Sequence, residues 1–139
     1  MSYQGSCLCG TIKYEVKKIE PHMAHCHCSM CRKFHGSAFA TFGEAKKDNF
    51  RWLQGAEFLS AYEAKNGTIR KFCSKCGSSM TFKASSGQED VVEFSLGTLD
   101  SDINHRPDAH IYIAYKANWL VLHDDLQKYS EGRDSKTET

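Results

Sequence analysis

Three cysteines lie within six residues of the sequence, at Cys26, Cys28 and Cys31, and Arg32 follows them directly. Packing hardly explains such a cluster, because side chains this close in sequence face different directions on a strand or a helix. Thiolates are soft ligands that suit zinc. The cluster therefore predicts a metal centre that organises the fold, in preference to a redox dithiol or a structural coincidence.

The other four cysteines form two shorter pairs, Cys7 with Cys9 and Cys73 with Cys76. A structural zinc site is closed by four protein ligands, whereas a catalytic site keeps three and leaves one position open. One partition therefore joins these four cysteines around a structural zinc, linking the N-terminal strand to the second half of the chain and stabilising a small domain.

That partition leaves the central three cysteines as a three-thiolate set with an open position. A different partition stays open, in which a histidine from the same stretch, His25 or His27, completes a second closed site. In an extended CxC segment the middle residue points away from a metal that its neighbours bind, which counts against His27.

Length and composition favour one compact β domain. The chain has 139 residues, of which 40% are hydrophobic and 25% charged, with a formal net charge of +1. We expect a domain over residues 1–131 and a disordered polar tail over 132–139. The near balance of charge argues against nucleic-acid binding. No signal peptide or membrane span is visible, so we expect a cytoplasmic protein whose thiols stay reduced.

Short strands with turn signals between them dominate the chain, and the pattern predicts a mainly antiparallel β fold with little helix. One short helix is expected from Ser29 to His35, ended by Gly36. Asn66-Gly67 is the strongest hairpin signal. We interpret Phe39 and Trp119 as core aromatics. Strands are expected at residues 11–16, 37–42, 49–53, 57–64, 68–72, 80–83, 91–99 and 109–115.

The three cysteine groups, in this order, resemble the glutathione-dependent formaldehyde-activating enzyme family, also called the Gfa or CENP-V-like family. Three later segments are similar to that family's C-terminal signature. The resemblance covers roughly residues 5–131 and rests on Gly5–Gly10, His25–Lys33, Phe72–Gly77, Gly97–Asp100, Ala109–Ile111 and Lys116–Trp119.

The resemblance implies a zinc-stabilised fold of folded-over antiparallel sheets, of the β-tent type. It implies a carbon–sulfur lyase that joins or releases formaldehyde at the thiol of glutathione. It also implies two zinc ions, the second of them labile. In this family the structural zinc would be held by Cys7, Cys9, Cys73 and Cys76, and the catalytic zinc by Cys26, Cys28 and Cys31.

The chemistry of a three-thiolate site agrees with that activity, because such a zinc still accepts a fourth soft ligand and a substrate thiol is one. Glutathione carries two carboxylates, for which Arg32 is the nearest cationic partner in sequence. His110 is a candidate general acid or base, although a buried histidine with satisfied hydrogen bonds is the more common role for such a residue.

Two other function classes remain open. A zinc-stabilised domain can serve as a protein-interaction module without catalysis. Alternatively, the three central cysteines can form reversible disulfides in a redox or metal sensor. Binding of a small thiol would favour the enzyme over both.

Overall fold

The computed structural model describes residues 2–87 and 89–138, and the chain divides into two compact units. The first unit contains the chain up to Pro21 together with Gly43–His105. The second contains His22–Phe42 and the chain from Arg106 onward. Both units are built mainly from short β-strands, so the predicted mainly β fold is confirmed.

A three-stranded antiparallel sheet in the first unit places the first cysteine pair. It has the order β1-β2-β5, with β1 over Tyr3–Ser6, β2 over Lys13–Val16 and β5 over Phe50–Gln54. The strand predicted at residues 11–16 is confirmed over Lys13–Val16. Apolar and polar residues alternate in β2 because Tyr14 and Val16 are fully buried on one face of the strand.

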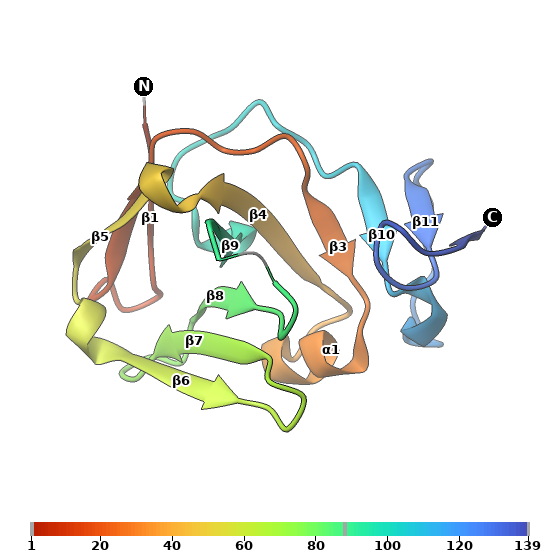
Figure 1. Ribbon diagram of the computed structural model, residues 1–139, viewed down its shortest axis with the longest axis horizontal. Helices are drawn as coiled ribbons and strands as arrows, with labels where there is room; N and C mark the ends of the chain where they lie inside the picture. Colours follow the sequence, from red (N-terminus) through yellow and green to blue (C-terminus); the bar gives the residue numbers. More distant parts are fainter. Residues whose placement is uncertain (1, 88, 139) are drawn as a thin grey trace. The chain divides into compact units, whose positions relative to one another are not determined.

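Four further strands of the first unit run antiparallel, in the order β6-β7-β8-β9 (Figure 1). They span Leu59–Glu63, Ile69–Cys73, Ser79–Lys83 and Val91–Ser95. The predicted Asn66-Gly67 hairpin is confirmed between β6 and β7, and Gly67 adopts φ +92° there. Because Cys73 ends β7 and Cys76 lies in the turn before β8, this meander delivers the second cysteine pair.

The core of the first unit is aromatic. The Tyr14 ring stacks on Phe50 with centroids 5.1 Å apart and an interplanar angle of 18°, and it lies 5.8 Å from the ring of Phe94. Its hydroxyl shares a 2.7 Å hydrogen bond with the Thr98 side chain, which satisfies the one polar atom that burial would otherwise leave unpaired.

In the second unit, strands pair in the order β12-β11-β10-β3-β4. Strand β3 is Ala24–Cys26, β10 is Ala109–Ile111, β11 is Gln127–Tyr129 and β12 is Thr137–Glu138. Strand β4, Ala40–Lys46, begins in this unit and ends in the first. Strand β10 runs parallel to both β3 and β11, so residues distant in sequence meet here.

The predicted helix is confirmed as α1, Ser29–His35. It ends at Gly36, which adopts the left-handed conformation at φ +60° and donates its backbone N–H to the carbonyl of Arg32. Basic residues occupy the last turn, where they complement the helix dipole. Within residues 2–87 and 89–138, four single-turn 3₁₀ helices are also present, at Lys47–Asn49, Ala56–Phe58, Leu96–Thr98 and Ile113–Tyr115.

The polar C-terminal segment after residue 131 contains β12, which pairs antiparallel with β11. Within it, Arg133 donates to the carboxylate of Asp108 at 2.6 Å and to the backbone carbonyl of Met23 at 3.1 Å. One guanidinium thus links this segment to residues beside β3 and β10. In the part of the chain that is described, no helix is long and apolar enough to cross a membrane.

Replacing Gly55 by alanine is expected to lower the free energy of unfolding by about 3 kcal/mol. Gly55 has φ +78°, and a Cβ at this position would lie 2.1 Å from the backbone carbonyl oxygen of Thr11, which cannot move without disturbing β2. Gly36→Ala is the matched control, because Gly36 is also left-handed but has open space around it, and should cost only about 1 kcal/mol. Urea denaturation measures both, and equal losses would show that the carbonyl contact is irrelevant.

Candidate metal centre and histidine network

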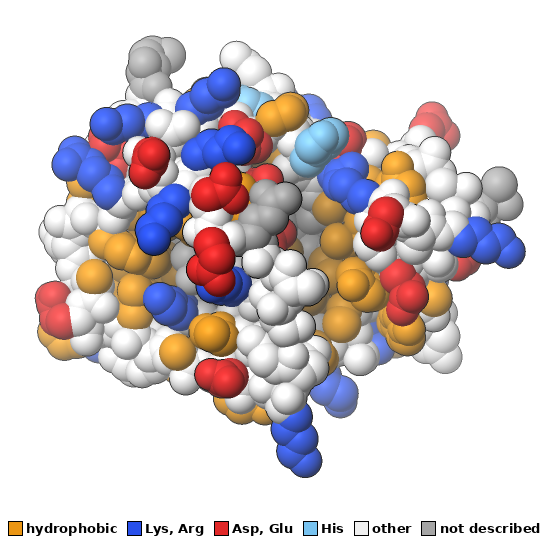
Figure 2. All heavy atoms as spheres, in the orientation of Figure 1, with side chains coloured by type: hydrophobic (Ala, Val, Ile, Leu, Met, Phe, Trp, Pro, Cys, Tyr) orange, Lys and Arg blue, Asp and Glu red, His pale blue; other side chains and the backbone are white. Residues whose placement is uncertain are grey.

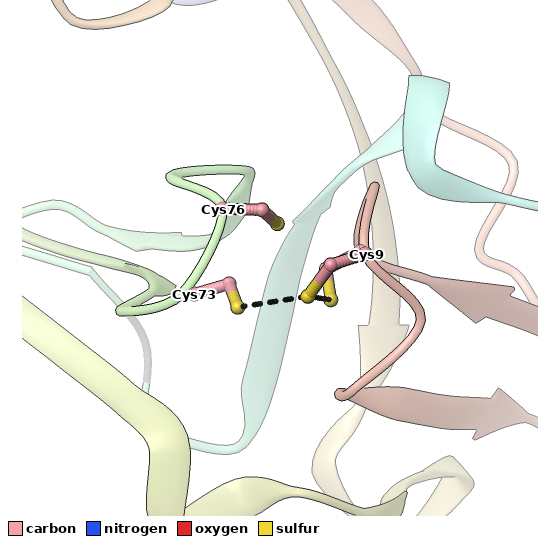
Figure 3. Close-up of side chains that lie close together, drawn as sticks. Cys9, Cys73 and Cys76 are labelled. Atoms are coloured by element: carbon pink, nitrogen blue, oxygen red, sulfur yellow. Dashed lines mark hydrogen bonds between the residues drawn. The ribbon is translucent and has the colours of Figure 1, made fainter.

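The first unit brings the sulfurs of Cys7, Cys9, Cys73 and Cys76 together, all within 4.8 Å of one another. The Sγ atoms of Cys7 and Cys9 are 3.6 Å apart, and those of Cys9 and Cys73 are 3.9 Å apart. Figure 3 shows the side chains of Cys9, Cys73 and Cys76 pointing toward a common centre from two loops. The two short cysteine pairs, distant in sequence, therefore meet in one cluster.

Two tight turns hold these cysteines. Gly10 and Gly77 follow the two pairs with φ of +78° and +82°, and their backbone N–H groups donate to the carbonyls of Cys7 and Cys73 at 3.0 and 2.8 Å. Glycine suits both positions because a side chain would strain the left-handed conformation. The backbone N–H of Ile12 also donates to the Cys7 sulfur at 3.3 Å, which holds that sulfur in place within the turn.

Three thiols of this cluster have shifted pKa values. The Ser78 hydroxyl, 3.3 Å from the Cys76 sulfur, lowers the pKa of Cys76 to about 5. Hydrogen bonding with Thr11 lowers the pKa of Cys9, whereas burial raises the pKa of Cys73 to about 11. The cluster thus combines favoured thiolates with a disfavoured one. Metal binding would deprotonate the remaining thiols, so its affinity depends on pH.

The geometry of this cluster fits a tetrahedral zinc ion. Zinc–sulfur bonds of about 2.3 Å in a tetrahedron place the sulfurs roughly 3.8 Å apart. The distances of 3.6 Å for Cys7–Cys9 and 3.9 Å for Cys9–Cys73 bracket that value. Four thiol ligands would fill the coordination shell, so the cluster could hold a metal ion in a closed site.

The central cysteines lie around the junction of β3 and α1 in the second unit. The Sγ atoms of Cys26 and Cys31 are 3.4 Å apart, and both side chains are buried. Cys28, at the N-cap of α1, is half-buried. Among the described residues, the three sulfurs do not form a set in which all distances are below 4.8 Å. The structure thus brings the sulfurs of two of the predicted ligands, Cys26 and Cys31, into contact.

Two buried histidines form a hydrogen-bonded chain beside the central cysteines. His27 Nε2 lies 2.8 Å from His110 Nδ1, and His110 Nε2 lies 2.9 Å from an oxygen of Asp124. Only the parallel pairing of β10 with β3 brings His110 to this place. Both His110 nitrogens are therefore engaged, in the arrangement of a satisfied buried histidine. The chain His27–His110–Asp124 had no signal in the sequence.

The Asp124 carboxylate determines one donor in this chain. Because a carboxylate only accepts, His110 Nε2–H donates to it, and the second hydrogen bond joins His110 Nδ1 to His27 Nε2. Burial, and then electrostatic interactions with His110, His25, Lys116 and Arg32, lower the pKa of His27 to about 4, so His27 is neutral near pH 7. Its Nδ1 is left buried with no hydrogen-bond partner in the described part of the chain.

Replacing Asp124 by alanine is expected to lower the free energy of unfolding by about 1–2 kcal/mol at pH 7, because buried His110 loses its acceptor. The hydrogen bond from His110 lowers the pKa of Asp124, so its contribution is complete above the usual carboxyl pKa of about 3.9. We expect the deficit to shrink as the pH falls below that value. Thermal unfolding between about pH 3 and pH 7 measures this dependence.

Asp125→Ala is the matched control for that prediction, since the neighbouring carboxylate is exposed. It should leave stability within about 0.5 kcal/mol of the unmodified chain at every pH. Equal deficits for the two variants, or a deficit of Asp124→Ala that persists in acid, would contradict the role assigned to the Asp124 carboxylate.

The remaining candidate substrate-binding residues of the second unit differ in their hydrogen bonding and in their exposure to solvent. Arg32 is half-buried, and its Nε is buried without a hydrogen-bond partner in the described part of the chain. Lys116 instead donates to the carbonyls of Ala117 and Leu120. The interpretation of Trp119 as a core aromatic is wrong, because its side chain is 67% exposed in an irregular segment.

Tyr112 is a further residue of interest that sequence reasoning missed. Among the described residues other than glycine, it alone adopts positive φ, at +57°. For a bulky side chain this conformation is costly, and such residues cluster at functional sites. Burial, and then the nearby thiols of Cys26, Cys28 and Cys31, raise the pKa of its phenol. The phenol therefore lies within electrostatic reach of all three central cysteines.

Comparison with known proteins identifies relatives of the chain. A family model described as glutathione-dependent formaldehyde-activating enzyme matches residues 2–115. A Halomonas elongata protein named "Putative glutathione-dependent formaldehyde-activating enzyme" is 29% identical over 129 residues, covering 88% of this chain and 82% of that protein. An uncharacterized lyase of Schizosaccharomyces pombe is 30% identical over 86 residues, covering 62% of this chain and 61% of that protein.

A crystal structure of a Rhodobacter sphaeroides protein has a similar fold, with a TM-score of 0.61. Its sequence identity is 23%, and the match covers 73% of this chain and 91% of that chain. This likeness concerns the fold. The resemblance inferred from the cysteine groups and C-terminal segments is confirmed by the family model and the two relatives.

Proposed function

We propose that the chain, which belongs to the glutathione-dependent formaldehyde-activating enzyme family, is a carbon–sulfur lyase that forms or cleaves the adduct of glutathione and formaldehyde. The names of the Halomonas elongata and Schizosaccharomyces pombe relatives support this class of reaction. One observation within the chain carries the proposal: the sulfurs of Cys26 and Cys31 are buried 3.4 Å apart. Cys28, two residues after Cys26, is half-buried.

The proposed site uses Cys26, Cys28 and Cys31 as ligands of a catalytic zinc. Bound there, zinc would supply a soft Lewis acid at which a substrate thiol loses its proton near neutral pH. Buried Cys26 and Cys31 form the fixed part of the ligand set, and Cys28, the N-cap residue of α1, completes the set. Arg32 is proposed to meet a glutathione carboxylate through its guanidinium, whose buried Nε has no hydrogen-bond partner in the described part of the chain.

The four cysteines of the first unit are proposed to hold a separate structural zinc, since their sulfur distances fit a closed tetrahedral site. We also propose a cytoplasmic location, where thiols stay reduced and can bind zinc. We therefore expect about two zinc ions per chain after gentle purification, with the three-ligand ion lost first on mild chelation.

Calorimetric titration with glutathione tests the proposed substrate class. We expect saturable heat with glutathione, and none with S-methylglutathione, which keeps both carboxylates but has no free thiol. Turnover of glutathione with formaldehyde, followed by NMR, should require the second zinc. An absence of heat with glutathione and with other small thiols on zinc-replete protein would refute the proposal and favour an interaction module.

A further inference from the structure

A groove in the first unit lies outside both cysteine sets. It has a volume of about 280 Å³ and is lined by residues of β5, β7 and β8 and by the start of β9. The volume is just below the roughly 300–1,000 Å³ typical of sites for drug-sized ligands, so an occupant would be small. In the view of Figure 2, hydrophobic side chains on the surface have lysine or arginine side chains beside them.

One wall of the groove is aromatic and held in place. Phe50 and Trp52 of β5 contact each other edge to face, with ring centroids 5.0 Å apart and an interplanar angle of 84°. Buried Tyr14 stacks on Phe50 and contacts Trp52 edge to face, which limits motion of both rings. Because Phe50 and Trp52 are themselves only half-buried, part of each ring remains for a flat apolar partner.

The opposite wall carries positive charge. In the antiparallel register, Lys71 of β7 pairs with Thr81 of β8, and Ile69 pairs with Lys83, so these four side chains share one face. None of the described residues that line the groove is acidic. Lys83 is paired with both oxygens of Glu89 at 2.9 Å, whereas the Lys71 ammonium has no ion pair in the described part of the chain. One cation is therefore left for an anionic ligand.

We propose that this groove binds a small aromatic carboxylate, with its ring against Phe50 and Trp52 and its carboxylate at Lys71. The rings favour a flat apolar body, and the free ammonium favours a single negative charge. The small volume excludes large conjugates. Nothing in this assignment depends on zinc or on the central cysteines, so its success or failure is independent of the lyase activity.

Phenylacetate is a suitable probe, and its uncharged counterpart phenylacetamide tests the role of charge. The chain has two tryptophans, Trp52 and Trp119, so Trp119→Phe leaves the Trp52 indole as the single reporter in fluorescence and in ¹H–¹⁵N spectra. For a ligand of this size at a half-open site we expect saturable shifts of the Trp52 indole with a Kd of about 1–5 mM. Phenylacetamide and acetate should each bind at least about threefold more weakly.

Lys71→Gln should weaken phenylacetate binding about threefold to fivefold, to the level of phenylacetamide, and should leave phenylacetamide binding unchanged. Lys65→Gln is the matched control, because Lys65 is an exposed lysine of the same β6–β7 hairpin that does not line the groove. Three results would overturn the proposal: no saturable Trp52 shift at about ten times the expected Kd, equal affinities for acetate and phenylacetate, or equal losses in the two lysine variants.

Discussion

Cys28→Ser is expected to reduce glutathione-dependent turnover by at least about 100-fold while leaving the melting temperature nearly unchanged. Serine lacks the thiolate that the proposed zinc needs, so the three-ligand set is broken. The fold should tolerate the change, because Cys28 is half-buried and caps α1 without a side-chain hydrogen bond, and serine is a favourable residue at an N-cap. Steady-state kinetics measure the turnover, and thermal unfolding followed by circular dichroism measures the melting temperature.

The pattern of losses matters more than the loss of activity alone. We expect Cys28→Ser to lose about one zinc per chain and to keep the more tightly held one. Undiminished turnover would remove Cys28 from the active site. A large fall in melting temperature together with the loss of turnover would show that the central cysteines stabilise the fold, contrary to the division of the seven cysteines into four and three.

Cys76→Ser should have the opposite profile, with a fall in the free energy of unfolding of about 3 kcal/mol or more and a fall in melting temperature of about 10 °C or more. The cluster of Cys7, Cys9, Cys73 and Cys76 would join two loops distant in sequence, so removing one ligand releases both. Cys76 is preferable to Cys73 for this test. Cys73 is fully buried, and a serine there would add the cost of a buried hydroxyl.

Ser74→Ala is the matched control for Cys76→Ser, because Ser74 is an exposed residue of the same turn. It should change stability by less than about 0.5 kcal/mol. A strong chelator should lower the melting temperature of the unmodified chain to that of Cys76→Ser. The same treatment should leave the melting temperature of Cys76→Ser unchanged. A chelator effect on the unmodified chain with no effect of Cys76→Ser would mean that a different set of ligands holds the stabilising metal.

Local signals in the sequence predicted the elements that carry the cysteines. The interval between Cys28 and Gly36 indicated a short helix, and α1 spans Ser29–His35 because a left-handed glycine ends it. Asn66-Gly67 indicated the turn between β6 and β7. These features are determined by residues within a few positions of each other, so a single sequence contains the information for them.

Other elements depend on contacts that no local pattern contains. Strand β3 is three residues long, too short for a clear alternation, and it forms because β10 and β4 lie beside it. The strand predicted at residues 109–115 is confirmed only as β10, which ends at Ile111, and Ile113–Tyr115 form a 3₁₀ helix instead. Strand β12 pairs with β11, in a segment that Arg133 links to Asp108. Trp119 was misread for the same reason, because an apolar residue shows its burial only when its neighbours are known.

The sequence by itself determined the chemistry available to this protein: seven thiols in three groups, the turns and the helix that hold them, and membership of a formaldehyde-activating family. The tertiary structure alone decided which groups meet. It brought Cys7 and Cys9 to Cys73 and Cys76, and it placed His110 between His27 and Asp124. The physical reason is that ligand types follow from composition and spacing, whereas distances between strands follow from register and from the burial of side chains that lie far apart in the chain.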